Sequence, residues 1–234
     1  MSEQYSPTGF RVLPPVVKNL LIINVLLYLA TFTMNRFHID LTDYLGLHVF
    51  MARDFKAYQL ITYMFMHGNF EHLFFNMFAL WMFGNTLENM WGSKRFLLFY
   101  MVCGIGAGLC QEVVQYIQYA TSLAQYDNVN LGGGQVITMA SYLNLLNTVG
   151  ASGAIYGLLL AFGMMFPNSM IYLYFFVPIK AKWFVIGYAV IELVSGFIGG
   201  GNVAHFAHLG GMLFGLILIL VWKKKGKLYG EREF

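Results

Sequence analysis

Charged residues are scarce in this chain. Its 234 residues include 14 Lys and Arg and 11 Asp and Glu, so that 11% are charged whereas 58% are apolar. A soluble domain has about 25% charged residues, and so few charges cannot cover a water-exposed surface of this size. The composition therefore excludes an ordinary soluble globule and predicts a protein whose surface mostly contacts lipid.

Cysteine and proline are also rare, with two and five residues. Cys103 and Cys110 lie in one apolar run, and in a helix their spacing would separate them by about 10 Å along the axis. Because bridged Cα atoms lie within about 7 Å of each other, we expect the two thiols to stay unpaired. No small-residue cleavage site follows the first apolar run, so we expect that run to be retained rather than removed as a signal peptide.

Six apolar runs are long enough to cross a bilayer, which takes a helix of about 20 residues. The expected spans are 16–34, 60–83, 96–118, 150–166, 183–199 and 205–222. The sequence thus predicts an all-α polytopic membrane protein. Its six-helix membrane domain is expected at 18–222, after a cytoplasmic segment at 1–17 and before a basic cytoplasmic tail at 223–234.

Basic residues are distributed unevenly between the two sides of the membrane. If the connecting segments alternate, one side carries all 14 Lys and Arg except Arg36, Arg53 and Lys56. Because Lys and Arg accumulate on the cytoplasmic side, we expect both termini in the cytoplasm. The Lys223 to Lys227 cluster is expected to anchor at lipid headgroups and not to bind nucleic acid.

Two of the loops expected on the outer side differ in character. Residues 35–59 are rich in aromatic side chains, so we expect this loop to be structured and partly buried in the outer leaflet. Residues 119–149 are polar and include Gly132, Gly133 and Gly134, so we expect this loop to be mobile.

Polar residues inside apolar spans are costly and are therefore functional candidates. His72 and Asn76 are four residues apart, on one face of the second span. Ser152 lies at the outer end of the fourth span and His208 near the outer end of the sixth. The expected orientation brings all four residues into the outer half of the membrane, where we predict that they converge.

Small residues predict that the fourth and sixth spans lie close together. Gly153 and Gly157 form a small-residue ridge on one span, and Gly211 and Gly215 form another. Such ridges let helix backbones approach closely in membranes. A serine and a histidine on these two helices can then come within hydrogen-bond distance.

A serine and a histidine at that distance permit nucleophilic acyl transfer. Ser152 would be the nucleophile and His208 the base that takes its proton. The Ser152 amide and the side chains of His72 and Asn76 would stabilise the oxyanion. We expect no acid to complete a triad, since Glu192 is near the middle of the fifth span and Glu112 is in the third. The sequence therefore predicts a Ser-His dyad.

Other interpretations of the same residues remain open. A serine beside glycines in a membrane helix can serve packing alone. Four histidines on the outer side could instead bind a metal ion. These are His67, His72, His205 and His208. Glu192 could be the proton-relay carboxylate of a transporter or a structural residue.

The order and spacing of these residues resemble the rhomboid family of intramembrane serine proteases. The resemblance covers about 18–222. The matching residues are His72 with Asn76, the segment 88–95, Gly150 to Gly153, and His208 with Gly211 and Gly215. The resemblance implies a six-helix bundle in its minimal bacterial form, with a short central fourth span and a fifth span that acts as a lateral gate.

The resemblance also implies an activity and the residues that carry it. Ser152 would be the nucleophile, His208 the general base and acid, and His72, Asn76 and the Ser152 amide the oxyanion hole, while Tyr156 would support the His208 ring. It implies substrates that are single-pass membrane proteins, cleaved in their transmembrane segments near the outer face, without metal or cofactor. It assigns no role to His205. An inactive rhomboid-like protein that only binds membrane helices is the alternative, and a small metal or ion transporter is a further one.

Overall fold

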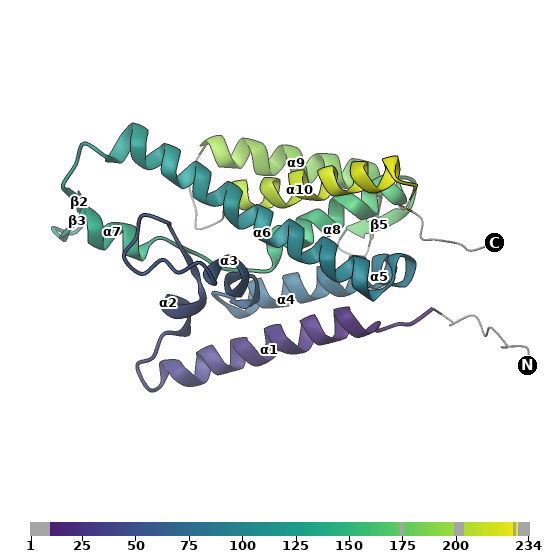
Figure 1. The fold of residues 1–234 in the computed structure, drawn as a ribbon, viewed down its shortest axis with the longest axis horizontal. Helices are drawn as coiled ribbons and strands as arrows, with labels where there is room; N and C mark the ends of the chain where they lie inside the picture. Colours follow the sequence, from purple (N-terminus) through teal and green to yellow (C-terminus); the bar gives the residue numbers. More distant parts are fainter. Residues whose placement is uncertain (1–9, 174–175, 199–203, 227, 229–234) are drawn as a thin grey trace, which may run out of the picture.

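The computed structural model is mostly helical and describes residues 10–173, 176–198, 204–226 and 228 (Figure 1). Residues 1–9, 227 and 229–234 of the predicted terminal segments lie outside the described residues, as does residue 199, the expected end of the fifth span. Four of the described helices are long and apolar enough to cross a membrane. They are α1 (Pro15–Asn35), α6 (Ser93–Gln118) with the π-helical turn η3 (Tyr119–Leu123), α9 (Ala181–Ile198) and α10 (His205–Lys224). The predicted spans one, three, five and six are thereby confirmed as helices.

The predicted fourth span is the shorter apolar helix α8 (Ser152–Met165). The predicted second span, 60–83, was wrong in its bounds, because residues 66–69 are not helical and a continuous helical run then covers 70–91. Before the break lie α3 (Gln59–Thr62) and the 3-10 helix η1 (Tyr63–Phe65), and after it α4 (Phe70–Ala79), the π-helical turn η2 (Leu80–Gly84) and α5 (Asn85–Trp91). The chain turns before α4 because the extended Asn69 caps the new helix, its side-chain oxygen accepting a 2.8 Å bond from the His72 amide.

The two outer loops meet in a short sheet. In the first loop, α2 (Leu41–Leu45) is followed by β1 (Leu47–His48), which pairs antiparallel with β4 (Asn147–Thr148) from the third loop. Leu47 and His48 are buried, in agreement with the prediction that the first loop is structured.

The third loop, which we expected to be mobile, contains regular secondary structure. Strands β2 (Asn128–Asn130) and β3 (Val136–Thr138) form a hairpin that leads into α7 (Met139–Leu145). Gly132, Gly133 and Gly134 have positive φ angles of 94°, 60° and 83°. The three glycines therefore form the turn of this hairpin, because residues with a Cβ rarely adopt that backbone region.

Helices α6, α8 and α10 pack against one another at the centre of the molecule (Figure 1). The close approach predicted for α8 and α10 is confirmed. A Cβ on Gly215 would lie 3.3 Å from the Cα of Gly157, and one on Gly211 would collide with the carbonyl of Gly153. A second hairpin, β5 (Met170–Leu173) with β6 (Val177–Lys180), connects α8 to α9.

Candidate active site

Ser152 is the first residue of α8, and the backbone before it is bent by a glycine. Gly150 has a φ of 129° and donates its amide to the carbonyl of Tyr63 at 2.9 Å. A residue with a Cβ would be strained at this φ. The turn sets Ser152 at the N-terminus of a helix, where unpaired backbone N–H groups favour negative charge.

The side chains of Ser152 and His208 are in hydrogen-bond contact. Nε2 of His208 lies 2.8 Å from Oγ of Ser152, although the two residues are 56 positions apart in the chain. His208 lies in the first turn of α10 and is 8% exposed. This distance is short enough for the imidazole to accept the hydroxyl proton.

The ring of Tyr156 lies flat against the histidine ring. Its phenol ring stacks on the His208 imidazole with centroids 4.2 Å apart and an angle of 7° between the planes. Tyr156 lies one turn after Ser152 on α8, so the same helix carries both the serine and the ring that supports the histidine.

The expectation that no acidic side chain lies beside His208 is wrong. Oε1 of Glu192, on α9, lies 3.0 Å from Nδ1 of His208 and also accepts a hydrogen bond from the Tyr156 hydroxyl. Oε2 of Glu192 lies 2.6 Å from Nδ1 of His205. The position of Glu192 in the fifth span predicted that it lies near the middle of the membrane. How far α9 is shifted along α10 decides whether it reaches His208, and the sequence of neither helix alone gives that shift. The contact also gives His205 a partner.

His72 lies beside the start of α8. A Cβ added to Gly150 would meet Nε2 of His72 at 2.7 Å and Oγ of Ser152 at 3.5 Å, so the imidazole and the hydroxyl flank the same glycine. Asn76 follows one turn later on α4, and its side-chain nitrogen is buried with no hydrogen-bond partner among the described residues. The His67 ring is 5.0 Å from that of His72, edge to face.

Residues 54–225 of the chain match the family model described as the rhomboid domain. The chain belongs to the rhomboid family. Three similar proteins are "Rhomboid-like protein 11, chloroplastic" of Arabidopsis thaliana (29% identical over 80% of this chain and 63% of its own length), "Rhomboid protein 1, mitochondrial" of Saccharomyces cerevisiae (28%, 74% and 45%) and "Rhomboid protease AarA" of Providencia stuartii (29%, 68% and 53%). The chain thus spans about half to two thirds of the length of these relatives.

In this rhomboid the segment 88–95 has a structural role that the sequence did not reveal. The buried Glu88 carboxylate accepts three hydrogen bonds. The donors are the backbone amides of Val16 at 2.9 Å and Val17 at 2.8 Å, and the hydroxyl of Ser93 at 2.6 Å. Val16 and Val17 are in the first turn of α1, and Ser93 begins α6. One carboxylate therefore satisfies free N–H groups at the start of α1 and joins that helix to α6.

The proposed site of this rhomboid contains a cluster of metal-binding residue types. Glu192, His205 and His208 each offer a donor atom within 4.8 Å of the others in the described part of the chain. His67 and His72, which the sequence suggested as further ligands, are not in this group. Glu192 forms a hydrogen bond with His205 and lies at ion-pair distance from His208, and neither contact needs an ion to hold it together.

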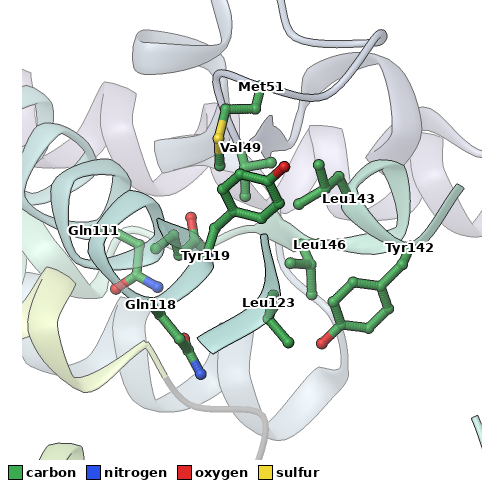
Figure 2. Close-up of a pocket in the computed structure, with 10 residues that line it drawn as sticks. Val49, Met51, Gln111, Gln118, Tyr119, Leu123, Tyr142, Leu143 and Leu146 are labelled. Atoms are coloured by element: carbon green, nitrogen blue, oxygen red, sulfur yellow. The ribbon is translucent and has the colours of Figure 1, made fainter. Parts of the chain in front are cut away.

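A separate pocket of about 110 Å³ lies where the end of α6 meets the first loop and α7 (Figure 2). Gln111, Gln115 and Gln118 of α6 line one part of it, and Val49, Met51, Leu143 and Leu146 line another. As far as the structure is described, Ser152 and His208 are not among its lining residues.

Proposed function

We propose that this rhomboid is an intramembrane serine endopeptidase that cleaves transmembrane segments of single-pass membrane proteins near the outer face of the membrane. The observation that carries the proposal is the 2.8 Å contact between Ser152 Oγ and His208 Nε2 at the partly buried start of α8. A serine hydroxyl is a weak nucleophile unless a base takes its proton, and this contact supplies the base. Membership of the rhomboid family supports the substrate class.

The reaction has two halves. Ser152 Oγ attacks the scissile carbonyl while its proton passes to Nε2 of His208. The tetrahedral intermediate then collapses, the C–N bond breaks, and His208 gives the proton to the leaving amine. In the second half a water molecule gives its proton to His208 and attacks the acyl-enzyme, and Ser152 recovers its proton as the acid product leaves. The residues that do this chemistry need no metal or organic cofactor.

Three groups are candidates for the oxyanion hole in this proposal. They are the amide of Ser152 and the side chains of His72 and Asn76. The unpartnered, buried side-chain nitrogen of Asn76 supports its assignment, because a buried donor without a partner is costly unless it serves a ligand. Gly150 and Gly153 shape the start of α8, and Gly211 and Gly215 hold α10 beside it.

We also propose the complete membrane arrangement. The continuous helical run 70–91 and α8 would add two spans to the four long helices, giving six in the domain 18–222. Both termini would be cytoplasmic, as the excess of Lys and Arg on one side indicates, and the membrane would be a bacterial inner membrane. The segments 1–17 and 223–234 would then flank the domain on the cytoplasmic side, without binding nucleic acid.

The purified protein in detergent, given a model single-pass transmembrane substrate, tests the activity. Wild type is expected to cleave it and to react with a fluorophosphonate probe, whereas Ser152→Ala and His208→Ala do neither. Ser122→Ala, at an exposed serine of η3, is the matched control and should behave as wild type. If wild type cleaves no more substrate than Ser152→Ala, the proposed protease activity is rejected. The alternatives that then remain are an inactive protein that binds membrane helices and a small transporter.

A further inference from the structure

The carboxylate of Glu192 lies at the far end of the His208 imidazole from Ser152. Nε2 contacts the serine hydroxyl at 2.8 Å, and Nδ1 lies 3.0 Å from Oε1 of Glu192. We propose that Glu192 is a positioning residue for the base, so that the site works as a Ser152-His208-Glu192 triad rather than a dyad. This inference rests on the proposed function.

The first part of this role concerns the tautomer of His208. To accept the proton of Ser152, Nε2 must be unprotonated, so the ring proton must be on Nδ1. Nδ1 is buried, and the acceptor that faces it in the described structure is Oε1 of Glu192. Nδ1 forms no hydrogen bond with this oxygen, although the two atoms are 3.0 Å apart. Such contacts commonly tighten when substrate is bound.

The second part concerns charge. His208 becomes positively charged when it takes the proton of Ser152, and it does so in a buried site, where an unpaired charge is costly. A carboxylate at 3.0 Å offsets that cost. Glu192 would therefore stabilise the imidazolium as it forms, and so the transition state more than the ground state.

The surroundings of Glu192 hold it in this orientation. Glu192 is on α9, and its side chain is 7% exposed. The Tyr156 hydroxyl donates to Oε1, and Nδ1 of His205 lies 2.6 Å from Oε2. The helices α8 and α10 thus each supply a partner that fixes the carboxylate behind the histidine.

A purely structural ion pair between α9 and α10 is the competing explanation. It would lower activity only through loss of folding, whereas a positioning residue changes how the rate depends on pH. The titratable groups around His208 are Glu192 of α9, Tyr156 of α8, His205 of its own helix and His72 of α4. Of these, Glu192 is the group that carries a negative charge in the contacts described here.

The test compares Glu192→Gln and Glu192→Asp with wild type in the transmembrane-substrate assay. Glu112→Gln is the matched control, because Glu112 is equally buried in α6 but accepts a hydrogen bond from the Phe50 amide instead. Glu192→Gln is expected to lower kcat strongly, since loss of the triad acid in serine proteases lowers kcat by about 10⁴-fold. KM should stay within a few-fold, and Glu112→Gln should leave both constants near those of wild type.

The pH profile separates the two explanations. Without the carboxylate the protonated imidazole is less favoured, so the acid limb of kcat/KM in Glu192→Gln should move to lower pH while its plateau falls. Glu192→Asp, which keeps the charge, should regain part of kcat. A Glu192→Gln protein with wild-type kcat, or one with low kcat, an unmoved acid limb and a lowered melting temperature, would overturn the triad. Because Ser152→Ala is measured in the same assay, an inactive wild type would show that the proposed function itself has failed.

Discussion

Gly211 of α10 lies directly against the backbone carbonyl of Gly153 in α8, and a Cβ at position 211 would overlap that oxygen. Gly153 follows Ser152 in the chain, and Gly211 is three residues after His208. The closest approach of the two helices therefore lies one turn or less from the contact between the proposed nucleophile and base. We expect the distance between those side chains to depend on this backbone contact.

Substitution of Gly211 by alanine tests that dependence. The added methyl group meets backbone, which cannot rotate away, so α8 and α10 must separate. Overpacking of this kind costs about 1–3 kcal/mol, and we expect Gly211→Ala to lower the melting temperature and to reduce kcat at least tenfold. Gly187→Ala is the control, because a Cβ at that helical glycine of α9 would meet nothing within 4 Å. Equal activity and melting temperature in both variants would contradict the prediction.

Loss of the Asn76 side chain should affect chemistry more than binding. Removal of one oxyanion-hole donor typically lowers kcat by about 10²–10³-fold. We therefore expect Asn76→Ala to lose kcat on this scale, with KM little changed and a melting temperature near that of wild type. Asn144→Ala, which removes an exposed contact with Asp54, should retain full activity. A higher KM with an unchanged kcat would argue against an oxyanion role for Asn76.

Glu88 is predicted to matter for stability and not for chemistry. Glu88→Ala leaves two backbone amides of α1 and the Ser93 hydroxyl without their acceptor. Hydrogen bonds to charged groups contribute about 1.5–3 kcal/mol each, so we expect a loss of about 3 kcal/mol in the free energy of unfolding, measured by denaturation in detergent. Glu71→Ala, at an exposed glutamate of α4, is expected to cost much less. Similar losses in the two variants would rule out the joining role of Glu88.

Metal removal should leave the activity intact. The proposed nucleophile and base are amino-acid side chains, so wild-type cleavage is expected to be unchanged after treatment with EDTA and dialysis. Activity that disappears with EDTA and returns with Zn²⁺ would instead favour a metal held by Glu192, His205 and His208. Substrate cleavage and metal content of the same samples decide between these outcomes.

Long apolar runs were predicted well because the bilayer imposes their length. The expected span 16–34 became α1 (Pro15–Asn35), and 205–222 became α10 (His205–Lys224). The second span was placed too early in the chain because the polar segment 67–72 interrupts the apolar run, and the Asn69 cap within it starts a new helix at Phe70. Local hydrogen bonding of this kind is invisible to a count of apolar residues.

The sequence by itself determined the membrane class, the helices of the core and the residues proposed for the site, because low charge and glycine spacing are local properties of the chain. Only the tertiary structure decided that Glu192 of α9 faces Nδ1 of His208 and that Glu88 holds the start of α1. Both contacts join residues from different helices. They depend on how far one helix is shifted along another, which packing of the whole bundle sets and the composition of a single span does not.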